Sequence, residues 1–228
     1  MKVLNMGGGV NTVALLLEYW KDYDLVLFSD TGGENPETYF YLENYIIPFC
    51  KSKNLEFVKV QSKLGTLEQY CLDKKQIPSR KFKWCTDKFK RTPIKQELRR
   101  RGATAKNPIT CSLGICSDES HRINTKYDNV KYQILDYPLI DHKITRRDCI
   151  EIIKKHGFPV PTKSACYYCY NSSKKEILKL RGNHKDLFDK METMESNSTR
   201  TFFNVPLKHY NEIQTLDDFG CDSGHCFN

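Results

Sequence analysis

A short apolar run near the start of the chain is followed by six residues that could bind an anion: Gly7, Gly8, Gly9, Val10, Asn11 and Thr12. Consecutive glycines let the backbone turn tightly and approach a ligand without a Cβ in the way. The segment that follows has helical spacing. Free N–H groups at a helix N-terminus attract anions, and the Thr12 hydroxyl would add a donor. The pattern predicts a phosphate-binding loop; a tight turn without a ligand is the simpler alternative.

The loop differs from the two best-known phosphate-binding motifs. It lacks the Gly-Lys-Ser/Thr ending of the P-loop. Its glycines also do not follow the Gly-x-Gly-x-x-Gly spacing of the dinucleotide fingerprint. The sequence therefore indicates phosphate chemistry of a different type.

Cysteines form the second group of residues that could do chemistry. Cys166 and Cys169 lie in a proline-containing loop, residues 158–170. A Cys-x-x-Cys pair can bind zinc, bind an iron–sulfur cluster or exchange disulfides. A thioredoxin-like pair normally opens a helix after a strand, so the loop position favours metal ligands, with free or redox-active thiols as the alternative. Four other cysteines are expected in the core: Cys50, Cys71, Cys111 and Cys149.

The last residues of the chain hold two more cysteines. Cys221 and Cys226 lie in a glycine-containing tail, and His225 precedes Cys226. A neighbouring histidine can lower the pKa of a thiol and favour the nucleophilic thiolate. Cys226 is therefore a candidate nucleophile, with a structural pair or an inert tail as the alternative.

The net charge of +8 over 228 residues is unevenly distributed. Residues 74–101 hold twelve Lys or Arg and two acids, which gives this segment +10 and leaves −2 for the rest of the chain. Such a concentration favours an anionic partner, such as a nucleotide phosphate, a sulfate ester or a nucleic acid. A solvated lysine-rich face is the alternative.

The elements that would position these residues follow from the spacing of apolar side chains. Strands are expected at residues 2–5, 25–29, 56–60, 109–116 and 132–137. Helices are expected at residues 12–20, 36–53, 92–101, 145–156, 174–181 and 187–195. Strands alternating with helices predict an α/β fold, a parallel twisted sheet with helices on both faces.

Composition limits the class of protein. With 39% hydrophobic residues the chain can form a packed core. No apolar run approaches the roughly 20 residues of a membrane-spanning helix, and no apolar signal follows Met1, so we expect a cytoplasmic protein. We expect a nucleotide-binding domain over residues 1–140 and a helical, cysteine-rich part over residues 141–228 that closes over the site.

The glycine loop, placed directly after the first strand, resembles the PP-loop of the adenine nucleotide α-hydrolase-like superfamily. That superfamily includes ATP pyrophosphatases and phosphoadenosine phosphosulfate reductases. In its motif, Ser-Gly-Gly-x-Asp-Ser, this chain has Gly7 for the first Ser, Asn11 for the Asp and Thr12 for the last Ser. The resemblance implies a Rossmann-like sheet and an ATP or adenylyl sulfate-type nucleotide on the loop, with magnesium where ATP is bound.

Two further segments resemble the phosphoadenosine phosphosulfate reductase branch. Residues 28–38 match its Asp-Thr-Gly strand end, which implies that Asp30 and Thr31 border the adenosine; a turn or helix-cap role is the alternative for Asp30. Residues 84–93 match its Cys-Thr…Lys…Pro stretch, which implies that one or more of Lys88, Lys90 and Arg91 lie near the far phosphates or the sulfate.

A third segment, residues 114–122, resembles the Gly-Ile-x-x-x-Glu-x-x-Arg motif of the same branch. Its Glu119 and Arg122 are three residues apart, so on a helix they would share one face. They would bind each other or the ligand, and a surface ion pair is the alternative.

Residues 159–169 resemble the branch's Pro-x-Pro-x-Lys-Ser-x-Cys-x-x-Cys segment, although Tyr170 replaces the usual following Pro. Relatives with sulfur-transfer activity have a cysteine at the position of Cys85. The resemblance implies that Cys85, Cys166 and Cys169 hold an iron–sulfur cluster with one open iron. With Cys116 or a tail cysteine as fourth ligand, they would hold a closed cluster or a zinc ion.

Two reactions fit this resemblance. In one, ATP adenylates a tRNA base, a DNA base or a small acid, and sulfur from a thiol or a sulfur-donor protein then displaces AMP. In the other, the Cys226 thiolate attacks the sulfur of an adenylyl sulfate. The candidate catalytic residues are Lys88, Arg122 and Cys226.

Two other classes of protein stay open. A nucleic-acid-binding protein would use residues 74–101 and would not turn over ATP. A metal-stabilised scaffold with a decayed nucleotide site would lose its fold on chelation. The sequence does not indicate whether the chain forms a homodimer.

Overall fold

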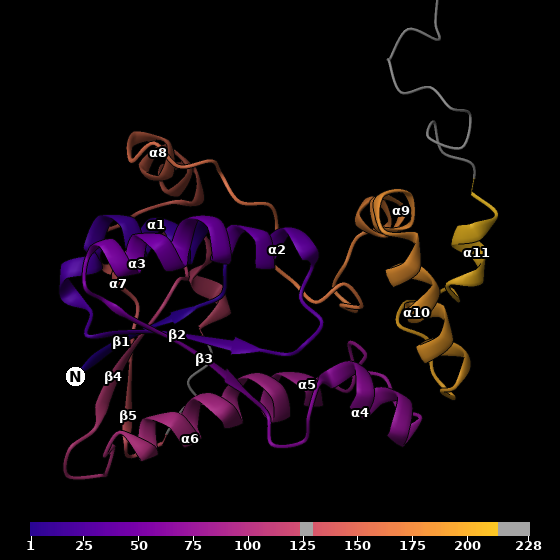
Figure 1. Cartoon of the computed structure of the whole chain (residues 1–228), viewed down its shortest axis with the longest axis horizontal. Coiled ribbons are helices and arrows are strands. Elements are labelled where there is room, and N and C mark those ends of the chain that lie inside the picture. Colours follow the sequence, from indigo (N-terminus) through magenta and orange to yellow (C-terminus); the bar gives the residue numbers. More distant parts are fainter. Residues whose placement is uncertain (124–129, 214–228) are drawn as a thin grey trace, which may run out of the picture.

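The computed structural model of the chain describes residues 1–123 and 130–213. Its five strands form one parallel sheet in the order β3-β2-β1-β4-β5. The strands are β1 (Lys2–Met6), β2 (Leu25–Asp30), β3 (Glu56–Gln61), β4 (Ile109–Leu113) and β5 (Gln133–Asp136). Figure 1 shows the sheet with helices on both of its faces. The predicted α/β class is confirmed.

The predicted helices of the first half begin and end close to the expected positions, and two further helical stretches are present. They are α1 (Val10–Tyr19), α2 (Pro36–Tyr41), α3 (Ile47–Ser52), α4 (Leu67–Lys74), α5 (Trp84–Thr86) and α6 (Thr92–Arg100). A π-helical turn, Leu42–Ile46, joins α2 to α3, and a second one, Asp87–Arg91, joins α5 to α6. Helix α4 and the helical residues before α6 were not predicted.

The second half contains α7 (Pro138–Asp141), α8 (Arg146–Lys155), α9 (Lys174–Asn183), α10 (Lys185–Ser196) and α11 (Lys208–Asn211). Helices α8 and α9 begin with capping boxes, Thr145 with Asp148 and Ser173 with Glu176. Each box satisfies N–H groups that a helix start would otherwise leave unpaired. Short 3₁₀ turns cover Trp20–Asp22 and Ser117–Arg122.

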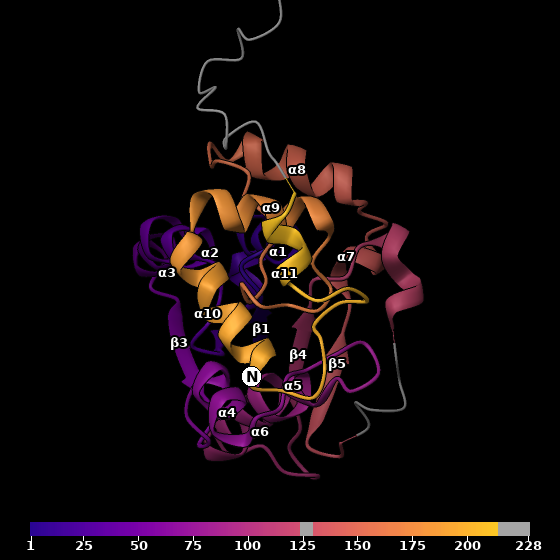
Figure 2. The same cartoon turned by 90° about the vertical axis from the view of Figure 1, so that its right-hand side faces the viewer.

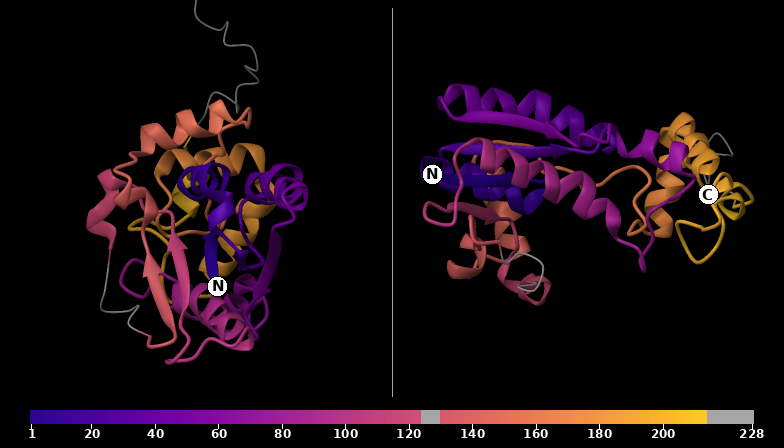
Figure 3. Two further views of the ribbon diagram at one scale, coloured as in Figure 1. Left: turned by 90° about the vertical axis from the view of Figure 1, so that its left-hand side faces the viewer. Right: turned by 90° about the horizontal axis from the view of Figure 1, so that it is seen from below.

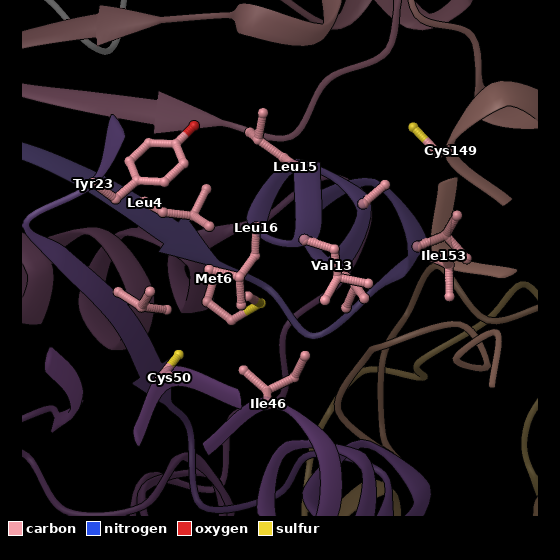
Figure 4. Close-up of a cluster of buried hydrophobic side chains, with 14 of the residues drawn as sticks. Leu4, Met6, Val13, Leu15, Leu16, Tyr23, Ile46, Cys50, Cys149 and Ile153 are labelled. Atoms are coloured by element: carbon pink, nitrogen blue, oxygen red, sulfur yellow. The ribbon is translucent and has the colours of Figure 1, made fainter. Parts of the chain in front are cut away.

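Alternate residues of each strand face opposite sides of the sheet and form two separate hydrophobic clusters. Leu4, Met6 and Phe28 pack with α1, α3 and α8 on one side, where Figure 4 shows the side chains converging. Val3, Leu25 and Leu27 pack against Leu98 of α6 on the other side. Helices on both faces explain why every residue of β2 is buried.

A third cluster lies beyond the carboxyl ends of the strands. It joins Leu67 and Cys71 of α4 to Tyr168 in the cysteine loop and to Phe188 and Met191 of α10. Helices α9 to α11 therefore share a core with α4, at the end of the molecule opposite the N-terminus (Figure 3). The carboxyl edge of the sheet faces this helical part (Figure 1).

Candidate functional site

A hollow of about 380 Å³ opens at the carboxyl end of β1 and β4. Strand β1 is central: the chain runs from it to β2 and β3 on one side and then crosses to β4 and β5 on the other side. Crevices at such switch points are the usual ligand sites of open parallel sheets. The hollow is lined by the glycine loop, by the turn after β4, by the start of α8 and by the segment before the cysteine pair.

The glycine loop places the N-terminus of α1 at the floor of this hollow. Gly8 has φ +74°, a conformation that residues with a side chain rarely adopt, and a Cβ there would lie 3.0 Å from Thr38. No side chain caps α1 at Gly9, and its first turn holds no acid. The start of α1 therefore presents its dipole and N–H groups to the hollow, as an anion site requires.

The Thr12 hydroxyl closes the loop upon itself. It accepts a hydrogen bond from the Gly7 N–H (3.3 Å) and donates one to the Gly9 carbonyl (3.1 Å). The loop is thus held in its turn before any ligand arrives. Four loop residues of the predicted site line the hollow: Gly7, Gly9, Asn11 and Thr12.

Asn11 connects three separate elements. Its amide group donates to Glu119 Oε2 (3.0 Å) and to the Gly114 carbonyl (3.2 Å), and its side-chain oxygen accepts from Arg146 Nη1 (3.1 Å). The side chain of Asn11 thus faces two acceptors, Glu119 and the Gly114 carbonyl, and one donor, Arg146. An amide can pair with both kinds of group, whereas a carboxylate could pair only with the donor. The replacement of the motif's Asp by Asn is explained by these neighbours.

Three cationic side chains line the hollow: Arg122, Arg146 and Lys163. The single carboxylate of the lining, Glu119, pairs with Arg122 Nη1 at 2.7 Å. The predicted Glu119–Arg122 pair is therefore present, and it lies at the site. The cations outnumber the acid, so the hollow is electropositive and suited to phosphate or sulfate.

The sequence did not single out Arg146, Lys163 or Ser164 as site residues. Ser164 lies so near the loop that a Cβ on Gly9 would be 2.9 Å from its Oγ. Lys163 also binds Glu176 Oε2 (2.9 Å). Two sequence features pointed toward these residues. The Lys-Ser dipeptide of the cysteine segment contains Lys163 and Ser164, and the Thr145 cap fixes where α8 starts. Neither feature shows that these residues lie near the glycine loop.

Asp30 and Thr31 do not line the hollow. Asp30 accepts hydrogen bonds from the Tyr39 hydroxyl (2.6 Å) and the Gly32 N–H (2.8 Å), and Lys59 lies 3.4 Å away. Burial acts to raise the pKa of Asp30, but these three partners outweigh it and hold that pKa below its ordinary value. In this structure its carboxylate holds the strand end together.

Three of the predicted metal ligands gather beside the strand ends. Cys166 belongs to the third hydrophobic cluster, Cys85 packs against that cluster, and the Cys169 N–H donates to the Cys166 carbonyl at 3.0 Å. Cys166 is buried, with its Sγ 3.1 Å from Thr31 Oγ1 and 3.5 Å from Glu34 Oε1. Burial raises the pKa of Cys166 and of Cys85, so both favour the neutral thiol.

This group of thiols is not arranged as a set of metal ligands. Among residues 1–123 and 130–213, no three His, Cys, Asp or Glu side chains converge as a metal ion would need. Cys116 is not part of the group. Its sulfur lies 3.9 Å from Cys149 in the core under α8. The hydrogen bond to Cys116 and burial raise the pKa of Cys149.

An ion pair between a half-exposed lysine and a buried glutamate borders the thiols. Lys90 Nζ lies 3.1 Å from Glu34 Oε1, which also accepts from the Thr31 hydroxyl at 3.1 Å. Burial acts to lower the pKa of Lys90, but the Glu34 carboxylate outweighs it and leaves that pKa above its ordinary value. A lysine of the basic segment thus keeps its charge beside Cys166 and Cys169.

The rest of the basic segment does not form one surface. Lys88 donates to the Tyr70 hydroxyl (2.7 Å) and lies over Trp84, outside the hollow. Arg100 and Arg101 both bind Glu97, and Arg101 also binds Glu56. The predicted place of Lys88 at the phosphates is therefore not seen. Cys226, the candidate nucleophile, lies outside the described residues.

An archaeal protein is similar to most of this chain. No family model matches the chain. It is 26% identical over 194 residues to an uncharacterized protein of Methanocaldococcus jannaschii, covering 81% of this chain and 44% of that protein. The chain thus spans less than half the length of that relative. Within the described part of the chain, no helix has the length and apolar character to cross a membrane.

Proposed function

We propose that this chain is an adenine-nucleotide-binding enzyme of the PP-loop type. It holds the phosphates of ATP or of an adenylyl sulfate in the hollow between the glycine loop and α8. The observation that carries the proposal is the joint lining of one hollow by the open N-terminus of α1 and by Arg122, Arg146 and Lys163.

The physical support is electrostatic. Helix N–H groups and guanidinium groups in fixed positions stabilise phosphate charge without having to reorganise. Arg146 is positioned by Asn11, and its backbone N–H donates to Asp118 Oδ1 at 3.1 Å. Arg122 is positioned by Glu119. Both guanidiniums are therefore held at the hollow before a ligand binds.

Two reactions use a nucleotide in this position. ATP would adenylate an acceptor at the α-phosphate with loss of pyrophosphate, after which a sulfur nucleophile would displace AMP. Alternatively, a thiolate would attack the sulfur of an adenylyl sulfate, giving an enzyme thiosulfonate and releasing AMP. In both, Arg122 and Arg146 would neutralise charge on the phosphates.

The thiols near the strand ends favour sulfur chemistry over simple phosphate transfer. Cys85 and Cys169 are partly exposed beside Lys90. An iron–sulfur cluster or zinc ion would need Cys166 as a ligand. The Cys166 thiol is hydrogen-bonded to Thr31 and Glu34, so the three cysteines as arranged do not fit a cluster or a zinc ion. Neither proposed reaction uses one.

Calorimetric titration of ATP, adenosine phosphosulfate and its 3′-phosphorylated form tests the proposal. Arg146→Ala should weaken the binding of the preferred nucleotide by about tenfold or more, the usual loss for a charge-assisted hydrogen bond. Arg147→Ala is the matched control, because Arg147 is exposed on the same helical turn and does not line the hollow. Equal effects of the two substitutions, or no saturable binding to the wild type, would refute the proposal.

A further inference from the structure

The largest of the hollows described lies away from the glycine loop. It is a groove of about 840 Å³ between the loop that precedes α5, residues 79–82, and the loop that precedes α11, residues 199–205. Figure 2 shows these two loops beside each other. The start of α9 borders the groove, and Phe202 and Tyr210 are buried at its base.

Positive charge and the absence of acids distinguish this groove. Four cations line it, Arg80, Lys81, Lys174 and Arg200, and no Asp or Glu is part of the lining. Within residues 1–123 and 130–213, none of the four forms a salt bridge with a carboxylate. The four charges are thus available to an anionic ligand.

An exposed aromatic ring lies among these charges. Phe82 is 47% exposed, and the Arg200 guanidinium lies 3.7 Å from the centre of its ring. The guanidinium and the ring form a cation–π pair and present flat faces at the mouth of the groove. Sites for single-stranded nucleic acids combine planar groups with cations: the bases stack on the planar groups, and the cations bind the phosphates.

The loop that carries Arg200 is held firmly. Both carboxylate oxygens of buried Glu195 accept backbone hydrogen bonds from this loop, from Phe202 (2.8 Å) and from Leu207 (2.6 Å). The groove wall is therefore formed before a ligand binds, which reduces the entropy that binding would cost.

The groove is connected to the proposed nucleotide site through the cysteine segment. Lys163 lines the nucleotide hollow and also a smaller hollow of about 210 Å³; Ser172 lines that smaller hollow and also the groove. Residues 163–172, which contain Cys166 and Cys169, thus run from one site to the other. A strand bound in the groove would lie at the far end of this segment from the nucleotide.

We propose that the groove binds single-stranded nucleic acid, and that this strand carries the acceptor base for the nucleotide-dependent reaction. The binding itself stands on the groove alone, whereas the acceptor role rests on the proposed function. A peptide with acidic side chains would use the cations but would gain nothing from the flat faces, so the observations favour a nucleic acid.

Fluorescence anisotropy of the full chain with a fluorescein-labelled 12-nucleotide single strand, as RNA and as DNA, tests this proposal. If all four cations bind phosphates, affinity should fall about fiftyfold between 50 and 200 mM NaCl, following a slope of about −0.7 per contact. The double variant Lys174→Gln/Arg200→Gln should reduce the slope by about 1.4. Lys154→Gln, an exposed lysine on α8, should leave it unchanged.

Substitution of the aromatic ring separates a nucleic acid from an acidic peptide. Phe82→Ala should weaken binding by roughly tenfold, the usual loss when a base loses its stacking partner. Phe40→Ala, which removes a ring on α2 that is more exposed than Phe82, should have no effect. Absence of binding, insensitivity to Phe82→Ala, or equal binding of labelled poly-glutamate would overturn the proposal.

Calorimetry on the same preparations distinguishes this inference from the proposed function. Groove variants should keep wild-type affinity for the nucleotide, and Arg146→Ala should keep wild-type affinity for the oligonucleotide. Nucleotide binding without oligonucleotide binding would overturn the groove inference alone. Oligonucleotide binding without nucleotide binding would support the groove as a nucleic-acid site and overturn its role in presenting an acceptor.

Discussion

Arg146 donates a hydrogen bond to the side-chain oxygen of Asn11 across 3.1 Å, although the two residues are 135 positions apart in sequence. The contact joins the first residue of α8 to the first turn of α1, at the place where a ligand phosphate would lie. Asn11 in turn donates to Glu119, which binds Arg122. One amide group therefore positions two guanidinium groups at the same hollow.

Asn11→Asp tests that network. The new carboxylate would lie about 3 Å from Glu119 Oε2, the distance that the amide nitrogen now spans. Two carboxylates this close cannot both ionise freely, so the pKa of one should rise in the folded protein. The variant should then be less stable than the wild type at pH 7, and the difference should shrink as the pH falls toward 5, since the folded variant takes up the extra proton.

Urea unfolding of wild type and Asn11→Asp between pH 5 and pH 8 measures this effect. A loss of stability that does not depend on pH would mean that the variant is destabilised by lost geometry and not by like charges. Nucleotide affinity of the variant should fall at pH 7, because added negative charge lies next to the phosphates.

Gly114 is the second position where the loop geometry can be tested. A Cβ there would lie 2.9 Å from the backbone nitrogen of Thr12 and 2.6 Å from its Cγ2. Gly114→Ala should therefore push the turn after β4 away from α1 and lower the free energy of unfolding by about 1–3 kcal/mol, the cost of overpacking. Gly7→Ala is the control, because its Cβ would meet only Thr12 Oγ1 at 3.9 Å. Equal stability of the two variants in urea would contradict the described packing.

Glu97 is expected to give the fold an acid-sensitive contact. Hydrogen bonds from Arg100 and Arg101 overcome the effect of burial and lower the pKa of Glu97 to about 2. Because this pKa is below that of an unfolded Glu, the stabilisation is complete above about pH 5 and is lost as the pH falls toward 2. Glu97→Gln should cost about 1.5–3 kcal/mol at pH 7 and progressively less below pH 5.

Chemical denaturation across this pH range measures the Glu97 effect. Glu151→Gln serves as the matched control, because its pair with Lys154 is exposed on α8 and such pairs contribute little. A difference between wild type and Glu97→Gln that stays constant from pH 7 to pH 4 would show that the carboxylate is not held by its arginines.

The thiols should differ sharply in reactivity. Of the eight cysteines in the described residues, only Cys85 and Cys169 are partly exposed. Burial raises the pKa of Cys50, Cys71 and Cys111 to about 12, which suppresses their thiolates. In protein with the tail cysteines replaced by serine, maleimide under native conditions should label Cys85 and Cys169 first, as mass spectrometry of the peptides would show.

Anaerobic purification makes the same labelling a test for a bound metal. If Cys85 and Cys169 are ligands, they should resist maleimide until a chelator is added, and the protein should contain stoichiometric iron or zinc. Rapid labelling of Cys50 or Cys111 in the native protein would contradict the buried positions described above.

The sheet was predictable from the sequence because its signals are local. The apolar runs of β1 and β2 and the glycines after β1 are enough to predict the order of strand, turn and helix. The helical residues 84–91 were missed because lysines and arginines obscure their apolar spacing. Helix α4 was missed because its eight residues are too few to give a clear helical period. In the fold Lys88 lies over Trp84 and Lys90 lies against Glu34, so part of this charge turns inward.

The site was only half predictable for a related reason. The glycine loop, Glu119 and Arg122 each belong to a motif that is continuous in sequence. Arg146 reaches the hollow because α8 packs on α1, and Lys163 and Ser164 reach it because the segment after α8 returns along the loop. No local pattern encodes those approaches, which depend on tertiary packing.

Hydrogen–deuterium exchange with and without saturating nucleotide tests the central claim most directly, because it reports where the ligand binds. The account predicts slower exchange in peptides that cover residues 7–13, 114–122 and 144–147 when ATP or an adenylyl sulfate is bound, with residues 199–205 unchanged. Protection confined to other segments, or none at a concentration that calorimetry shows to be saturating, would contradict a phosphate site at the start of α1.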